Sequence, residues 1–189
     1  LASFATAYEG EKGDVMVVAE DLMRTNFIKI DANDTISQLL GAIKKDGDNF
    51  ALIFDGKSYL GFADKKWLLR SRLNPAEAKV KNCLKHVPIL TKISKLADIV
   101  RLMIAADVRA LPVKADNKIL GIVVAKDVVK ELRDFYKNVS VDVVMSGKIV
   151  VCRDNDEIGK VMNIMNQKNV DRVPVVDNKN KILGIVSLI

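Results

Sequence analysis

The sequence predicts an α/β fold built from three similar units that follow one another along the chain. The first observation is an internal repeat, because the hexapeptide Lys-Ile-Leu-Gly-Ile-Val occurs at residues 118–123 and again at 181–186. The second is an amphipathic helical pattern that recurs about every 60 residues. The third is a short polar turn between two apolar runs, typical of a β-hairpin, which recurs with the same period.

Three amphipathic helices are expected to supply one buried face to each unit. Their apolar residues fall at i, i+3, i+4 and i+7, which is one face of an α-helix. These residues are Ile36, Leu39, Leu40 and Ile43 in the first unit, Leu96, Ile99, Val100 and Met103 in the second, and Ile158, Val161, Met162 and Met165 in the third.

Short apolar runs around each helix predict three small sheets. A short helix opens each unit, ending near Met23, Leu84 or Met145, and a leading strand follows at 27–30, 87–90 or 149–151. The hairpin strands are predicted at 51–54 and 59–63, at 110–113 and 119–124, and at 172–176 and 182–187. With closing helices at 65–71 and 126–136, each unit runs helix–strand–helix–strand–strand–helix.

The period places the three units at residues 14–73, 74–138 and 139–189. Asn74-Pro75-Ala76-Glu77 has the pattern of a helix start, which favours a boundary there. Units of about 60 residues bury little surface alone, so we expect the first two to pack as a pair. The sequence begins without Met and ends inside a repeat. We therefore expect a longer chain in which the third unit pairs with a fourth unit after Ile189, or with another copy.

Composition narrows the class of protein. Hydrophobic residues make up 49% and charged residues 29%, as in globular proteins, and no apolar run is long enough for a membrane span. With no signal peptide and no disulfide framework from Cys83 and Cys152, we expect a cytoplasmic protein. Two cysteines and one histidine do not have zinc-site spacing, and the GxxxxGK, GxGxxG and HExxH motifs do not occur. The sequence therefore predicts neither a metal centre nor an enzyme.

The repeated motif Pro-Val…Asp…Leu-Gly-Ile-Val…Asp resembles that of the CBS (cystathionine β-synthase) domain. The resemblance covers about residues 14–189 and is weaker in the first unit, which has Leu52-Ile53 where the others have Leu-Pro or Val-Pro. It implies an α/β fold of tandem CBS repeats, paired into a Bateman module. It also implies a regulatory role, in which AMP, ADP, ATP or S-adenosylmethionine binds in the cleft between paired repeats. We further expect a homodimer formed through the repeats and an unknown effector protein as partners.

The family's site reads Gly-x-x-Ser/Thr-x-x-Asp at the start of the last helix. The carboxylate suits two ribose hydroxyls, and the hydroxyl with the helix N–H groups suits a phosphate. The second repeat has Asp127 at the carboxylate position but Val124 at the hydroxyl position, and Lys126 or Arg109 could supply charge instead. The first repeat has Asp64 and Trp67 at these positions.

The third repeat has the hydroxyl, Ser187, but its carboxylate position would follow Ile189. The resemblance thus implies ligand contacts from residues of the second and third repeats. The candidates are Arg109, Ala110, Leu111, Pro112, Ile122, Val124, Lys126 and Asp127, together with Arg172, Val173, Pro174 and Ser187.

Two alternatives to nucleotide sensing stay open. Asp127 near a helix N-terminus also stabilises the helix without any ligand, so the repeats could form a ligand-free scaffold. The net charge of +6 and the basic segment 65–72 would suit a nucleic-acid-binding accessory domain. Because the other lysines are spread along the chain, nucleic-acid binding is the less favoured of the two alternatives.

Overall fold

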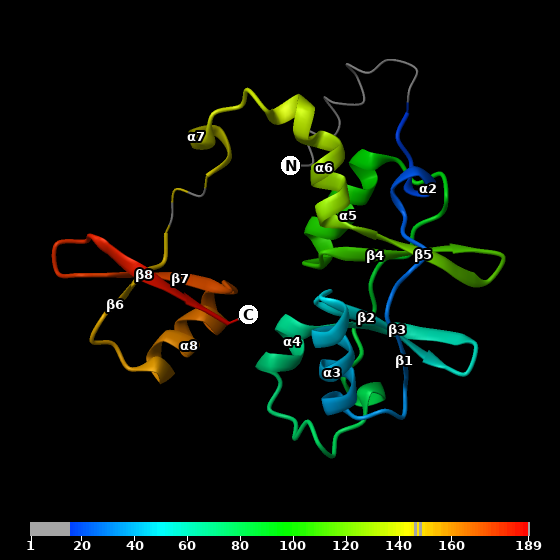
Figure 1. Ribbon diagram of the computed structural model, residues 1–189, viewed down its shortest axis with the longest axis horizontal. Coiled ribbons are helices and arrows are strands. Elements are labelled where there is room, and N and C mark those ends of the chain that lie inside the picture. Colours follow the sequence, from blue (N-terminus) through cyan, green and yellow to red (C-terminus); the bar gives the residue numbers. More distant parts are fainter. Residues whose placement is uncertain (1–15, 146, 148, 189) are drawn as a thin grey trace. The chain divides into compact units, whose positions relative to one another are not determined.

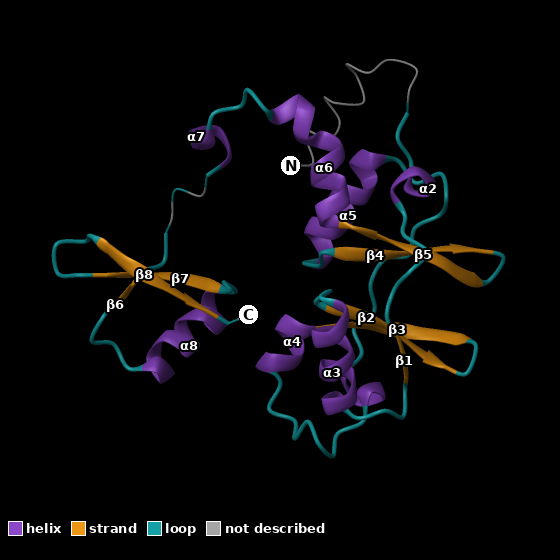
Figure 2. Ribbon diagram, viewed as in Figure 1, coloured by secondary structure: helices purple, strands orange, loops and turns teal. Residues whose placement is uncertain are grey.

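The computed structural model describes residues 16–145, 147 and 149–188. The chain divides into two compact units between Asn138 and Val139, and each is described by itself below. The predicted starting residue 14 and Ile189 lie outside the described residues. The observed fold is mixed α/β, with short sheets and flanking helices, as the sequence predicts (Figures 1 and 2).

The first repeat forms a three-stranded sheet covered by helices. In chain order its elements are α2 (Ala19–Leu22), β1 (Lys29–Asp31), α3 (Ile36–Asp46), β2 (Phe50–Asp55), β3 (Ser58–Asp64) and α4 (Lys65–Arg70). β1 is parallel to β2, and β2 is antiparallel to β3. Helix α3 begins at a capping box between Thr35 and Gln38 and ends at Gly47, whose φ of 83° is left-handed.

The second repeat has the same order of elements around a two-stranded sheet. They are the 3₁₀ helix η1 (Val80–Cys83), α5 (Leu96–Ala106), β4 (Ala110–Ala115), β5 (Lys118–Val124) and α6 (Ala125–Tyr136). The β4–β5 hairpin turns at Asp116 and Asn117, whose φ values of 48° and 60° are those of a tight hairpin turn. The predicted helical face is confirmed here, because Leu96, Ile99, Val100 and Met103 are all buried.

The first two repeats are joined by two matching pairs of backbone hydrogen bonds. Arg24 and Ile122 exchange N–H···O bonds of 2.9 and 2.9 Å, and Lys85 and Phe62 exchange bonds of 2.8 and 2.9 Å. Arg24 and Lys85 occupy the same position in their repeats, as do Ile122 and Phe62. The pairing is therefore close to two-fold symmetric within one chain. Figure 2 shows the two sheets as neighbours, with α3 and α4 flanking one and α5 and α6 flanking the other.

A glycine allows this close approach in each repeat. A Cβ at Gly121 would lie 2.5 Å from the carbonyl oxygen of Arg24, and a Cβ at Gly61 would lie 3.3 Å from that of Lys85. The residues that follow, Ile122 and Phe62, are 1% and 0% exposed and belong to one hydrophobic core. The two repeats consequently share a core, which is how units this small become stable.

The third repeat forms its own three-stranded sheet. Its elements are α7 (Val141–Val144), β6 (Cys152–Arg153), α8 (Ile158–Lys168), β7 (Arg172–Val176) and β8 (Ile182–Ser187). The two predicted hairpin strands of this repeat are confirmed. Its core is small, with Cys152, Val161, Met165 and Val173 as its fully buried members.

Several predicted elements were wrong or displaced. The strand expected at 87–90 is reduced to one parallel bridge between Leu90 and Val113, because Pro88 has no N–H to donate to a ladder. Asn74 caps only a single turn, accepting a hydrogen bond from the N–H of Ala76 at 3.1 Å, and no helix follows directly. The third leading strand forms at β6, just after the predicted 149–151.

The helical face predicted for the third repeat is also only half buried. Val161 and Met165 are in the core, but Ile158 is 62% exposed and Met162 is 45% exposed. Both belong to the predicted stripe, so the pattern identified the helix correctly but not what covers it. Among the described residues, no helix has both the length and the apolarity needed to span a membrane.

Candidate functional site

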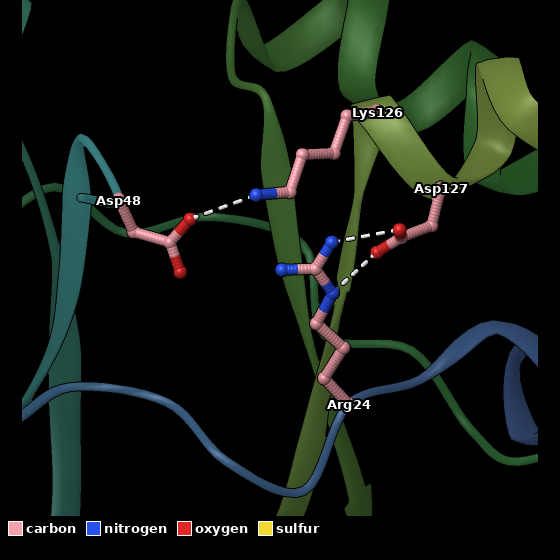
Figure 3. Close-up of polar contacts among 4 residues, drawn as sticks. All are labelled: Arg24, Asp48, Lys126 and Asp127. Atoms are coloured by element: carbon pink, nitrogen blue, oxygen red, sulfur yellow. Dashed lines mark hydrogen bonds and ion pairs between the residues drawn. The ribbon is translucent and has the colours of Figure 1, made fainter. Parts of the chain in front are cut away.

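Asp127, the predicted ribose ligand, lies in the first turn of α6 and faces the segment that opens the first repeat. Arg24 from that segment binds it through two guanidinium nitrogens, Nε and Nη2 (Figure 3). Its Nη2 donates to Oδ1 of Asp127 at 2.7 Å, and its Nε lies 2.6 Å from Oδ2. The side chains are 34% and 24% exposed, so this bidentate pair is only partly screened by water.

Lys126, the neighbour of Asp127, makes a second contact between the repeats. Its Nζ lies 3.4 Å from Oδ1 of Asp48, which follows α3 in the first repeat. The Asp48 side chain is 15% exposed and the Lys126 side chain 60% exposed. Figure 3 shows the two ion pairs next to each other.

Three of these residues, Arg24, Asp48 and Lys126, line a cleft between the first two repeats, and Asp127 lies beside it through its ion pair with Arg24. Its cavity has a volume of about 560 Å³ and is lined from both repeats by Met23, Arg24, Thr25, Asn26, Asp46, Gly47, Asp48 and Lys126. We call it the Asp127 cleft. The hydrogen bond to Asp127 raises the pKa of the Arg24 guanidinium, which therefore stays charged at any physiological pH.

The other predicted residues of the second repeat lie mostly in the core. Ala110 and Leu111 are 0% exposed, Ile122 is 1% exposed, and Pro112 is buried with them. Val124 occupies the N-cap position of α6, is 4% exposed and makes no side-chain cap. A direct contact of these residues with a ligand stays a prediction.

Arg109 lies at the opposite end of the pair, in a second cavity of about 340 Å³. The apolar wall of this cavity comes from α5 and α6, and its polar rim consists of Asp64, Lys66, Asp107 and Arg109. Lys66 lies 3.8 Å from Asp107, which repeats the contact of Lys126 with Asp48. The structure therefore does not bring Arg109 together with Asp127, although the sequence analysis grouped them.

The residues at this second end suit a ribose less well. Trp67 stands where the second repeat has Asp127, and it is 38% exposed. Lys85, the counterpart of Arg24, donates to the backbone carbonyl of Ala106 at 2.7 Å. Asp64 caps α4 by accepting from the N–H of Lys66 at 2.8 Å, and burial raises the pKa of its carboxyl.

The predicted residues of the third repeat lie in the second unit. Arg172 and Ser187 are exposed register partners at one end of the β7–β8 pair. Val173 is 0% exposed in the core of this unit, and Pro174 is half-buried. Ser187 is thus an exposed residue, and its role as a phosphate contact stays a prediction.

Arg24 and Asp48 were missed by the sequence analysis. Arg24 follows Met23 as Lys85 follows Leu84, so the repeat itself marks a position where a cation follows the opening helix. That signal could have singled out the position, but not its partner 103 residues away. Within the part of the chain that the structure describes, no group of three or more His, Cys, Asp or Glu residues could hold a metal ion.

Comparison with known proteins identifies the family. The family model for the CBS domain matches residues 80–134 and 139–189, more than half of the chain. The chain belongs to the CBS-domain family. The matched ranges fall within the second and third repeats. The first repeat has a similar order of elements and pairs symmetrically with the second.

Two curated relatives come from methanogenic archaea. Uncharacterized protein MJ1225 of Methanocaldococcus jannaschii is 21% identical over 184 residues, covering 88% of this chain and 66% of that protein. A homoserine O-acetyltransferase of Methanosphaera stadtmanae is 26% identical over 114 residues, covering 59% of this chain and 23% of the enzyme. The chain thus spans just under two thirds of the first relative and less than a quarter of the second.

Solved structures share the fold at low sequence identity. The crystal structure of MJ1225, described as a proposed archaeal homologue of g-AMPK, has a TM-score of 0.78 at 15% identity. It covers 91% of this chain, which spans 70% of that one. The cytosolic domain of the Mg²⁺ channel MgtE in complex with ATP has a TM-score of 0.52 at 20% identity, covering 61% of this chain and 48% of its own.

Proposed function

We propose that the chain is a regulatory module that binds an adenosine compound in the Asp127 cleft: AMP, ADP, ATP or S-adenosylmethionine. CBS domains are typically regulatory and ligand-binding rather than catalytic. The observation that carries the proposal is that Asp127 meets Arg24 beside a cleft between paired repeats, where Lys126 supplies a second cation next to Asp48.

The chemistry of these groups matches the parts of a nucleotide. A carboxylate accepts hydrogen bonds from two adjacent ribose hydroxyls, and a guanidinium or ammonium group binds phosphate. The cavity of about 560 Å³ falls within the ordinary range for small-molecule sites. The ATP complex of MgtE and the description of MJ1225 support a nucleotide as the ligand class.

Regulation follows from where the cleft lies. The first repeat supplies seven of its eight lining residues and the second repeat supplies Lys126, so a ligand that reaches Lys126 contacts both repeats. A ligand shifts an equilibrium between two packing arrangements by its difference in affinity for them. We propose that this shift in packing is the signal, and that a separate effector protein responds to it.

Thermal unfolding tests the proposal with AMP, ADP, ATP and S-adenosylmethionine. A compound that binds only the folded chain raises its melting temperature by mass action. We expect at least one compound to do so, and expect Asp127→Ala to abolish the ligand-dependent rise. Asp98→Ala is the matched control, because Asp98 pairs with Arg101 on the surface and lies outside the cleft. If none of the four raises the melting temperature, the proposal is wrong.

A second candidate function is a scaffold that needs no ligand. Arg24 already satisfies Asp127 across the two repeats, so the pair is held together without a bound molecule. The exposed strand β8 supports assembly, since Ile182, Leu183 and Ile185 are 66%, 54% and 64% exposed. We propose that a second copy covers this face, forming a homodimer through the third repeat. Sedimentation showing only monomers at micromolar concentration would exclude that homodimer.

A further inference from the structure

The carboxylate that the proposed function assigns to ribose is already bound by Arg24. Both oxygens of Asp127 face the guanidinium, at 2.7 Å from Nη2 and 2.6 Å from Nε. A ribose that donates two hydroxyls to Asp127 must therefore displace Arg24 from at least one of them. Breaking a partly buried bidentate pair is unfavourable unless the released guanidinium finds another anion.

We propose that Arg24 selects phosphorylated ligands by exchanging Asp127 for the ligand's phosphate. In this exchange Asp127 is released to the ribose hydroxyls while the guanidinium turns to the phosphate in the same cleft. The inference rests on the proposed function and narrows its ligand class to adenine nucleotides. Adenosine supplies no anion for Arg24. S-adenosylmethionine places a sulfonium cation where a nucleotide has its phosphate, and its single carboxylate lies farther from the ribose, beyond that cation.

The backbone around Arg24 allows such a rotation. Its N–H and C=O are fixed by the two hydrogen bonds to Ile122, both 2.9 Å, so the main chain stays in place. The side chain is 34% exposed and lines the cavity of the cleft. The guanidinium can therefore move between two anions by rotating its own side-chain bonds, without separating the repeats.

The other charges of the cleft make Arg24 the deciding cation. Asp46 and Asp48 also line the cavity and repel a phosphate, while Lys126 is held by Asp48 at 3.4 Å. A phosphate that recruits Lys126 leaves Asp48 without that partner. A phosphate that recruits Arg24 leaves Asp127 to the ribose of the same ligand, so both groups stay paired.

The symmetric position at the other end supplies a matched control. Lys85 has the same backbone bonds, to Phe62, but its Nζ donates to the carbonyl of Ala106, and Trp67 stands in place of the aspartate. Removing the Lys85 charge should remove its contact with Ala106 at the other end of the pair and leave the Asp127 cleft unchanged. Arg24→Gln thus removes a charge from the Asp127 cleft, and Lys85→Gln removes a charge at the matching position outside it.

Calorimetric titration with AMP, adenosine and S-adenosylmethionine tests the exchange. We expect the wild-type chain to bind AMP at least about tenfold more tightly than adenosine, the worth of a hydrogen bond to a charged group. In Arg24→Gln, AMP should bind more weakly and adenosine more tightly than in wild type, bringing their ratio close to one. Lys85→Gln should keep the wild-type ratio.

The outcomes separate the inference from the proposed function. If adenosine compounds bind but Arg24→Gln keeps the wild-type ratio, or S-adenosylmethionine binds more tightly than AMP, the exchange is wrong and the function stands. If no compound binds the wild-type chain, both are wrong. Should Arg24→Gln fail to fold by circular dichroism, Arg24→Lys replaces it, because it keeps the charge and loses the fork. That variant should lose part of the AMP preference, and an unchanged ratio would overturn the exchange.

Discussion

At one end of the paired repeats Asp127 meets Arg24, and at the other end Trp67 and Lys85 occupy the same two positions. The backbone contacts at the two ends are nearly identical, with a pair of hydrogen bonds of 2.8–2.9 Å at each. Pairing thus depends on main-chain geometry that both repeats keep. The side chains at these positions differ, with an ion pair of Asp127 and Arg24 at one end and Trp67 with Lys85 at the other.

The third repeat extends the comparison, because it carries the pairing strand without a described partner. Ile185 is 64% exposed, whereas Ile122 in the identical hexapeptide is 1% exposed. A Cβ at Gly184 would meet nothing within 4 Å, whereas one at Gly121 would meet the carbonyl of Arg24. The same six residues are therefore buried or exposed according to what packs on them.

The largest expected effect comes from Gly121→Ala. Its new Cβ would lie 2.5 Å from a backbone oxygen, so the repeats must move apart, and we expect about 3 kcal/mol of destabilisation. Gly61→Ala should cost less, since its nearest neighbours lie at 3.3 Å. Urea unfolding followed by the fluorescence of Trp67, the single tryptophan, reports on this unit. Equal stability of Gly121→Ala and wild type would contradict the close packing of the pair.

Gly184→Ala is the control in the third repeat. Because nothing surrounds the position within 4 Å, we expect a change within about 0.5 kcal/mol. Circular dichroism during urea unfolding follows this unit as well as the first. A loss as large as that of Gly121→Ala would mean that the face of β8 is already tightly covered in solution.

Truncating the matched isoleucines should give the next largest difference. Ile122→Ala removes a side chain that is 1% exposed in the shared core and should cost about 3 kcal/mol. Ile185→Ala should cost under about 0.5 kcal/mol in a monomer, because the side chain is already in water. The measurement is again urea unfolding, at a concentration where sedimentation finds a monomer. Equal losses in the two variants would remove the distinction between a paired and an exposed repeat.

The smallest expected effect concerns Asp64, which stands at the position of Val124. Burial raises the pKa of its carboxyl, so the folded state binds the proton more tightly than the unfolded state does. The resulting stabilisation is complete below the unfolded pKa and is lost as the pH rises through the folded pKa. Asp64→Asn can still cap α4 and avoids that loss. It should be more stable than wild type at pH 7, by under about 1 kcal/mol, and show no such gain at pH 3.

Val124→Asn is the control for Asp64→Asn. It places the same amide at the matching cap of α6, where no titrating group is replaced. Any difference between Val124→Asn and wild type should therefore be independent of pH between 3 and 7. Melting temperatures across this range decide the comparison, and a pH-independent effect of Asp64→Asn would contradict the raised pKa.

Periodicity predicted most of the fold because repeats impose the same local patterns three times. The hairpin strands β7 and β8 were predicted to the residue, and the buried face of α5 was correct at all four positions. The strand predicted at 87–90 was wrong because Pro88 has no N–H for a strand ladder, which an apolar pattern does not reveal. Ile158 and Met162 were assigned to a core because periodicity reports amphipathicity, not the presence of a covering partner.

The site was harder to predict than the fold. The family motif pointed to Asp127, but its partner Arg24 is 103 residues away and comes from the other repeat. Arg109 was grouped with Asp127 because both are in the second repeat, whereas Arg109 lines one cavity and Asp127 pairs with Arg24, which lines the other. A site built between repeats can be located from sequence only once the pairing is known.

Calorimetric titration of AMP into wild type, Asp127→Asn and Trp67→Ala tests the central claim most directly. If the nucleotide binds at the end that carries Asp127, then Asp127→Asn should weaken AMP binding at least about tenfold, because the ribose loses a charged acceptor. Trp67→Ala should leave the affinity unchanged, since it alters only the other end. Binding that survives Asp127→Asn and is lost in Trp67→Ala would contradict the account and move the site to the opposite cavity.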